Sequence, residues 1–311
     1  MAEKLVKLIR AANELGNGPR KVCVAIGVFD GVHLGHQQII RQTVADARQH
    51  NAVALVVTFD QHPNAVVAPD KVPPQIFSRP QKLRAVEALG ADAMLEIPFD
   101  QNFSEKSGEV FIRELVRDLG KIFSICVGAD FVFGRKRSGN VGLLKKLGAE
   151  LDFQVHGHAA VALDGELVSS TRIREAIRTG NLDGASQMLG RTYAICGRVL
   201  TGDRLGRQLG FPTANLEVDK LVLPPNGVYA GCTRVDGKLY RAAVNLGVRP
   251  TVATGKPELR VEAHLLDFGG DLYDQELELE FGKKLRAEQK FLSVAELKAQ
   301  ITRDVAAVRA D

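Results

Sequence analysis

A pair of histidines stands in a glycine-rich segment that directly follows an apolar run typical of a strand. The segment reads Gly27-Val28-Phe29-Asp30-Gly31-Val32-His33-Leu34-Gly35-His36, and helical spacing begins at its end. A strand that ends in such a turn before a helix presents backbone N–H groups and the positive end of the helix dipole to an anion. His33 and His36 can donate to phosphate oxygens of one ligand, and Gly35 lets that ligand approach the backbone closely. The pattern therefore predicts a phosphate-binding site.

Histidines at the start of a helix have two other interpretations. They can cap the helix, or they can form half of a metal site. No carboxylate or cysteine accompanies His33 and His36 at ligand spacing, which makes zinc the weaker alternative.

A second group of candidate side chains opens a later predicted helix, in the segment Leu167-Val168-Ser169-Ser170-Thr171-Arg172-Ile173-Arg174. Hydroxyls and N–H groups at a helix start can bind phosphate oxygens. The guanidinium groups of Arg172 and Arg174 can offset negative charge on a leaving pyrophosphate. Taken alone, Ser170 and Thr171 would be interpreted as an ordinary N-cap. Their pairing with the histidine segment favours a triphosphate clamp.

The C-terminal part contains a third candidate, Thr201-Gly202-Asp203-Arg204-Leu205-Gly206-Arg207-Gln208-Leu209-Gly210-Phe211-Pro212-Thr213-Ala214-Asn215. Its three glycines stand four residues apart, so the loop could wrap phosphates with its own amides. Thr213 and Asn215 point the same way on an extended segment and can share one Mg²⁺ or phosphate through neutral oxygens. A plain glycine-rich hairpin is the alternative, and the segment lacks the Walker A pattern.

The elements that position the first two groups alternate between strands and helices. Apolar runs predict strands at 22–28, 53–59, 93–97 and 122–127, and helical spacing predicts helices at 35–50, 79–89, 108–119 and 141–151. Gly90 and Gly120 lie where C-caps belong. This alternation predicts an α/β, Rossmann-like domain with a parallel sheet and right-handed crossovers.

After Gly190 the pattern changes to short strands, which we predict at 193–200, 228–235, 238–246, 259–267 and 276–281. Asp236-Gly237 is a hairpin-turn signal. We predict a small antiparallel β-barrel and then a C-terminal helix that begins with a capping box formed by Ser293 and Glu296. The boundary is expected near residues 183–191, which gives domains 1–186 and 187–311.

The first two candidate segments resemble the nucleotidyltransferase superfamily, in which HxGH follows the first strand. The resemblance is closest to the prokaryotic bifunctional riboflavin kinase/FMN adenylyltransferase family and covers nearly the whole chain. It rests on these segments, on the blocks Thr58-Phe59-Asp60-Gln61-His62-Pro63 and Gly128-Ala129-Asp130-Phe131-Val132-Phe133-Gly134, and on the signature GxxxGRxLGFPTAN at Gly202–Asn215. Gln61 stands where the family often has proline, a departure that concerns loop stiffness rather than chemistry.

The resemblance implies that the N-terminal domain is a nucleotidyltransferase that moves an adenylyl group from MgATP to FMN and releases pyrophosphate. His33 and His36 would stabilise charge on the ATP phosphates. Asp130 would bind a ribose or help to place Mg²⁺, with a turn-capping carboxylate as the alternative. Weaker candidates are Asn64 and the run 135–137. The residues implied in ATP and phosphate binding are Gly27, Phe29, Asp30, Gly31, Gly35, Asp130, Ser170, Thr171, Arg172 and Arg174.

For the C-terminal domain the resemblance implies a six-stranded barrel that phosphorylates riboflavin to FMN with MgATP. Glu262 is the expected base for the ribityl hydroxyl, and its apolar neighbours suggest that it faces inward. An outward strand carboxylate is the alternative. Thr213 and Asn215 would hold Mg²⁺, and Phe291 is a weaker flavin contact. The residues implied in ATP and flavin binding are Gly202, Gly206, Arg207, Gly210, Phe211, Pro212, Thr213, Asn215 and Arg286.

Composition is that of an ordinary soluble protein, 45% hydrophobic and 25% charged. No apolar run reaches the roughly 20 residues that cross a bilayer, and no secretory signal opens the chain, so we expect a cytoplasmic protein without membrane contact. Residues 1–186 hold 23 basic and 21 acidic side chains, so the net charge of +4 is not concentrated and nucleic acid is not an expected partner. The four scattered cysteines are expected to be reduced core residues.

Two rival functions stay open at this level. One domain could be active while the other only binds flavin, or the chain could be a flavin sensor without turnover. Loss of a key residue would mark such a protein, and all five are present: His33, His36, Thr213, Asn215 and Glu262. The expected partners are therefore riboflavin, FMN, FAD and ATP. The sequence leaves the oligomeric state, including a homo-oligomer, open.

Overall fold

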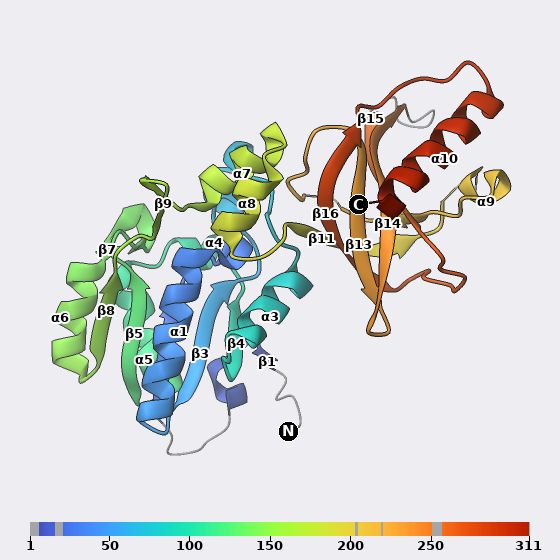
Figure 1. Ribbon diagram of the computed structural model, residues 1–311. Coiled ribbons are helices and arrows are strands. Elements are labelled where there is room, and N and C mark those ends of the chain that lie inside the picture. The colour runs from blue at the N-terminus through green and yellow to red at the C-terminus, as the bar shows by residue number, and fades with distance from the viewer. Residues whose placement is uncertain (1–5, 16–20, 203–204, 219, 251–256, 311) are drawn as a thin grey trace. The chain divides into compact units, whose positions relative to one another are not determined.

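The computed structural model describes residues 6–15, 21–202, 205–218, 220–250 and 257–310 (Figure 1). The chain divides into two compact units, Met1–Pro74 with Arg79–Ser170 and Gln75–Ser78 with Thr171–Asp311. The domain limit predicted between residues 186 and 187 falls within helix α8 (Leu182–Leu189). The functional boundary between the domains therefore stays a prediction.

The first unit is built on a parallel sheet with the strand order β1-β4-β3-β2-β5-β8. Its strands are β1 (Lys7–Ile9), β2 (Val22–Ile26), β3 (Val53–Phe59), β4 (Ala93–Ile97), β5 (Ile122–Gly128) and β8 (Gln154–His158). The four predicted strands are confirmed to within two residues at each end. The edge strands β1 and β8 were not predicted.

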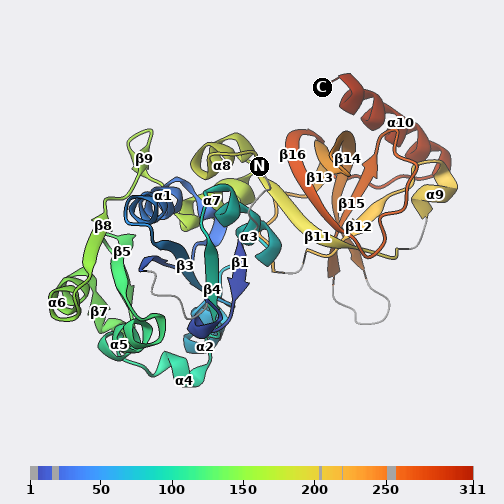
Figure 2. The same ribbon diagram turned by 90° about the horizontal axis from the view of Figure 1, so that it is seen from below.

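Helices cover both faces of this sheet (Figure 2). Successive residues of β2 face opposite sides of the sheet and so contact different helix layers. Val24 packs with residues of α5 and α6, whereas Cys23 packs with Ala47 of α1. The helices are α1 (Leu34–Gln49), α2 (Asn64–Val67), α3 (Arg79–Ala88), α4 (Gln101–Ser104), α5 (Gly108–Leu119) and α6 (Val141–Leu151). Short elements complete the unit: the 3-10 helices η1 (Ala12–Leu15), η2 (Asp30–Val32), η3 (Pro69–Lys71) and η4 (Arg135–Arg137), with the hairpin strands β6 (Val132–Phe133), β7 (Gly139–Asn140), β9 (Ala162–Leu163) and β10 (Glu166–Leu167).

The second unit contains a closed antiparallel barrel with the strand order β11-β12-β15-β14-β13-β16. The strands are β11 (Ala194–Leu200), β12 (Ala214–Leu216), β13 (Gly227–Val235), β14 (Lys238–Pro250), β15 (Pro257–Leu265) and β16 (Glu276–Arg286). The predicted hairpin at Asp236-Gly237 is confirmed, with both residues at positive φ, 50° and 77°. Its helices are α7 (Ser170–Thr179), α8, α9 (Leu205–Leu209) and α10 (Val294–Ala310).

Helix α10 packs on the outside of the barrel, where Val308 joins a small core with Ala230 and Ala243 (Figure 1). The Ser293 hydroxyl accepts the Glu296 N–H at 3.2 Å, as the capping box predicts. The Glu296 carboxylate reaches back to the N–H of Leu292, at 3.1 Å, rather than to that of Ser293.

The four cysteines are free thiols. Cys23, Cys126 and Cys196 are buried, and Cys232 is half-buried. The expected place in the core is confirmed for Cys23, Cys126 and Cys196, but Cys232 is only partly buried.

Candidate active sites

The histidine segment and Asp130 both follow the carboxyl ends of strands in the parallel sheet. From β2 the chain adds β3 and β4 on one side, and β5 and β8 lie on the other, so β2 and β5 form the switch point. In open α/β sheets, ligands bind outside the carboxyl ends of such a pair. Residues 27–36 follow β2 at this edge, and Asp130 lies exposed just after β5.

The turn after β2 has a left-handed and closely packed backbone. Phe29, Gly31 and Val32 have φ angles of 50°, 78° and 38°, which is rare for a phenylalanine and rarer for a β-branched valine. The Phe29 ring is buried against Gly27, where an added Cβ would lie 3.1 Å from the ring. Asp30 is also buried. Strain of this kind concentrates at functional sites.

The imidazole rings of the two histidines stack on each other. His33 is the N-cap residue of α1 and His36 lies in the first turn of that helix. Their ring centroids lie 3.6 Å apart with planes 22° apart, and the Phe29 ring meets His36 edge-on at 5.2 Å. A Cβ at Gly35 would approach the His33 ring to 3.3 Å, so a larger residue would crowd it. The helix start predicted at the histidines is confirmed.

The hydroxyl of Ser170 connects the second predicted segment to the first. It donates to the Asp30 carbonyl at 3.1 Å across 140 residues of sequence. Ser170 also begins α7, as predicted. Thr171 is exposed, Arg172 half-buried and Arg174 buried, and these three belong to the second unit.

The weaker candidates of the first unit take part in local contacts. The Asn64 side-chain amide donates to the Lys71 carbonyl at 2.9 Å. The run 135–137 forms the exposed 3-10 helix η4, in which Arg135 pairs with Glu105 at 3.0 Å. Phosphate contact by these residues stays a prediction.

Lys82, which was not predicted from the sequence, contacts the turn after β2. Its ammonium donates to the Val28 carbonyl at 3.1 Å, and the Thr58 hydroxyl donates to the same oxygen at 3.0 Å. The Val28 carbonyl immediately precedes the left-handed turn. Lys82 lies 54 residues away on a helix with several charged residues, so no local pattern distinguished it.

Two cavities in the barrel unit share part of their walls. One of about 270 Å³ and one of about 300 Å³ are both lined by Thr213 and Asn215. The first also contains the predicted residues Gly202, Arg207 and Pro212. The second also contains the predicted residues Gly206, Phe211, Glu262, Arg286 and Phe291. Gly210 is found in neither lining and has a φ of 91°.

The glycines allow close packing on the segment that bears Thr213 and Asn215. An added Cβ at Gly202 would clash with the Asn215 side chain, and one at Gly206 would clash with the Phe211 carbonyl. Residues 205–209 form α9, so part of the expected wrapping loop is helical. Asp203 and Arg204 of the signature lie outside the described residues.

Glu262 lies on β15 between two asparagines on the neighbouring strands, paired with Asn215 of β12 and Asn245 of β14. Val261 and Ala263 are buried in the core, and the half-buried Glu262 takes the opposite face, where it lines the second cavity. The expected inward direction is therefore corrected. Successive strand residues alternate faces, so apolar neighbours in the core turn the carboxylate away from it.

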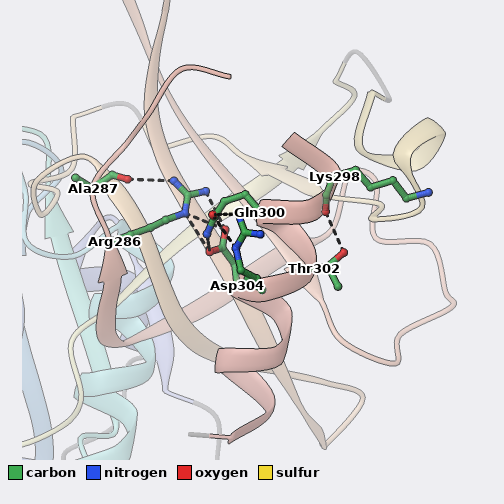
Figure 3. Close-up of polar contacts among 7 residues, drawn as sticks. Arg286, Ala287, Lys298, Gln300, Thr302 and Asp304 are labelled. Carbon is green, nitrogen blue, oxygen red and sulfur yellow. Dashed lines mark hydrogen bonds and ion pairs between the residues drawn. The ribbon is translucent and has the colours of Figure 1, made fainter. Parts of the chain in front are cut away.

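A buried carboxylate fixes Arg286 in the second cavity (Figure 3). The guanidinium donates to Asp304 through Nε at 3.0 Å and through Nη2 at 2.8 Å. Its Nη1 donates to the Ala287 carbonyl at 3.1 Å, and Gln300 donates to Asp304 at 2.8 Å. The Arg286 guanidinium lies 5.8 Å from the centre of the Phe291 ring. Asp304 was not predicted from the sequence, because its only signal there is its place on an amphipathic helix.

The donor set at Thr213 and Asn215 fits a magnesium ion. Mg²⁺ prefers oxygen ligands and commonly takes one or two from protein while substrate phosphates supply others. The hydroxyl and amide oxygens at the junction of the two cavities provide such ligands. The described residues contain no cluster of three or more His, Cys, Asp or Glu side chains that could hold a metal without substrate.

Two family models match successive parts of the chain. The family model described as FAD synthetase matches residues 17–172, and the model described as riboflavin kinase matches residues 189–311. A solved structure described as a macrolide-efflux protein from Streptococcus pneumoniae superposes with a TM-score of 0.82 at 28% identity, covering 98% of this chain and 99% of that one. Every helix in the described part of this chain is too short or too polar to span a bilayer.

Two curated relatives match nearly from end to end. The bifunctional riboflavin kinase/FMN adenylyltransferase of Escherichia coli K12 is 39% identical, over 96% of this chain and 96% of that protein. The protein of the same name from Pseudomonas fluorescens is 39% identical, over 98% of this chain and 97% of that protein. The chain therefore belongs to the bifunctional riboflavin kinase/FMN adenylyltransferase family.

Proposed function

We propose that this chain phosphorylates riboflavin to FMN in its C-terminal part and adenylylates FMN to FAD in its N-terminal part, using ATP in both reactions. The observation that carries the kinase assignment is the pair of cavities that meet at Thr213 and Asn215. A kinase needs such a junction, because the γ-phosphoryl group must pass from the nucleotide to a hydroxyl across one point.

In the kinase reaction, the cavity lined by Glu262 and Arg286 takes the flavin, and the cavity lined by Gly202 and Arg207 takes ATP. Glu262 accepts the proton of the ribityl hydroxyl as its oxygen bonds to the γ-phosphorus, and ADP leaves. Thr213 and Asn215 would hold Mg²⁺, which neutralises charge on the transferred phosphate.

In the adenylylation, a phosphate oxygen of FMN attacks the α-phosphorus of ATP, and the bond to pyrophosphate breaks. His33 and His36 donate to phosphate oxygens from the start of α1, where the helix dipole also favours negative charge. Asp130 supports ribose or metal binding at the same edge of the sheet. Ser170, Thr171 and Arg174 are proposed to hold the β- and γ-phosphates, and Arg172 is a further candidate for phosphate binding.

Other properties stay predictions from the sequence. These are the division at residues 186 and 187, the cytoplasmic location, the absence of nucleic-acid and membrane partners, and the use of Mg²⁺.

Incubation of the purified chain with riboflavin, ATP and Mg²⁺, followed by chromatography, tests the proposal. We expect FMN to appear first and FAD to follow. FMN alone would refute the adenylyltransferase assignment, and bound flavin without any product would favour a sensor. Omission of Mg²⁺ with added chelator is expected to abolish FMN formation.

A further inference from the structure

A cationic side chain lies beneath the strained turn that carries the histidines. The Val28 carbonyl accepts two hydrogen bonds, from the Thr58 hydroxyl of β3 and from the Lys82 ammonium of α3. Two donors satisfy both lone pairs of this oxygen. The residue that follows, Phe29, begins the left-handed backbone that leads to His33. Lys82 therefore contacts the backbone at the point where the chain departs from β2.

Lys82 is half-buried, and charged side chains surround its ammonium. Asp30 of the turn and Glu96 of β4 are both buried and act on it electrostatically. Arg79, one turn earlier on α3, donates to Glu96 at 2.9 Å. Burial lowers the pKa of Lys82 from its ordinary value, and the two carboxylates only partly oppose this. A lysine in such a setting is costly to keep charged, which is typical of functional positions rather than of surface lysines.

We propose that Lys82 is a positioning residue for adenylyl transfer, holding the Val28 carbonyl and so fixing the left-handed turn that presents His33 and His36 to ATP. This inference rests on the proposed function of the N-terminal site. Lys82 acts through the turn and contacts no reacting atom. The Thr58 hydroxyl already supplies a neutral donor to the same oxygen. The distinct contribution of Lys82 is therefore its positive charge. The ammonium adds a positive charge next to the turn that is proposed to bind phosphate.

Three variants test this role. Lys82→Met keeps the length of the side chain but removes the charge and the donor. Lys82→Arg keeps both. Lys145→Met removes an exposed lysine on α6 and serves as the control for general loss of charge. FAD formation from supplied FMN is measured for each, with FMN formation from riboflavin in the same samples as an internal reference.

Lys82→Met is expected to lower kcat for FAD formation by about 10- to 100-fold, the range caused by small misplacement of catalytic groups, and to change KM for FMN much less. Lys82→Arg is expected to recover most of this loss, and Lys145→Met to behave as wild type. FMN formation should be unchanged throughout. Full FAD formation by Lys82→Met would overturn the proposal, as would equal losses in Lys82→Met and Lys145→Met.

The pH dependence provides a readout that a purely structural role would not move. Wild-type FAD formation is expected to fall in the alkaline range as Lys82 loses its proton. The fall should come at a pH below the pKa of an ordinary lysine, because the pKa of Lys82 is lowered. Lys82→Arg should lose this alkaline fall because a guanidinium stays charged. Loss of stability does not explain the fall, because a lysine with a lowered pKa contributes stability that rises with pH between its folded and unfolded pKa values.

An alkaline limb that is identical in wild type and Lys82→Arg would contradict the proposal. Absence of FAD formation in the wild type would instead refute the proposed function itself, which separates the two failures.

Discussion

Arg286 uses most of its hydrogen-bonding capacity within the protein. A guanidinium has five N–H donors, and contacts to Asp304 and Ala287 engage Nε, Nη1 and Nη2. The charge is also neutralised by a carboxylate that is 6% exposed. We therefore expect Arg286 to contact the flavin ring through the flat face of its guanidinium rather than to bind a phosphate.

Replacing Asp304 with alanine should affect both stability and flavin binding. The substitution leaves a partly buried guanidinium without its carboxylate, which costs about 2–3 kcal/mol, below the full penalty for a buried pair because Arg286 is partly exposed. Urea unfolding should report this loss, and KM for riboflavin should rise more than kcat falls. Asp304→Asn, which retains the shape, is the matched comparison. Unchanged stability and KM in Asp304→Ala would contradict the assigned role.

The candidate side chains could be predicted from the sequence, but the residues that hold them in position could not. Histidines, paired hydroxyls and Glu262 are recognisable because chemistry requires their types at short spacing. Lys82 and Asp304 act on partners 54 and 18 residues away, so their importance depends on contacts that only the folded chain creates. The predicted direction of Glu262 was wrong for a related reason. On a strand, two apolar neighbours in the core place the residue between them on the opposite face of the sheet.

At the scale of elements, long apolar strands were predictable and short or polar ones were not. The strands β3 and β4 are confirmed at the predicted residues. The three-residue β1 is too short for any periodicity, and β8 reads Gln-Val-His-Gly-His, which lacks an apolar pattern. Both lie at sheet edges, where one side of the strand needs no partner and the demand for apolar residues is weaker.

A methyl group at Gly202 should disable the kinase reaction through the neighbouring strand. An added Cβ clashes with Asn215 on β12, so that side chain must move, and a displacement of about 1 Å can cost about 100-fold in rate. FMN formation by Gly202→Ala is the measurement. Gly269→Ala adds the same methyl to the wall of the same cavity but into open space, and is expected to lose far less. Equal rates in the two variants would refute the steric explanation.

Removal of the Ser293 hydroxyl should weaken the start of α10. Ser293→Ala removes the N-cap bond to the Glu296 N–H, which costs about 1 kcal/mol. Because Arg286 is held by Asp304 on this helix, we expect a rise in KM for riboflavin in the same direction as for Asp304→Ala, but smaller. Thermal unfolding and KM measured together check this prediction, and a normal KM with lowered stability would limit the effect to the cap.

At the scale of the whole molecule, the two sets of predicted residues fall largely on separate frameworks. The histidine turn and Asp130 belong to a parallel sheet, while Thr213, Asn215 and Glu262 belong to the barrel. The order of the two domains and their fold classes were predictable, since strand-helix alternation and a run of short strands have different periodicities. The division between compact units at Ser170 and Thr171 was not, because the helices α7 and α8 continue the helical pattern of the N-terminal part.

Paired single substitutions test most directly that one chain holds two independent ATP-dependent sites. Glu262→Gln is expected to form no FMN from riboflavin yet to convert supplied FMN into FAD at the wild-type rate. His36→Ala is expected to form FMN normally and to stop there. If either substitution abolished both activities, the two-site account would be wrong.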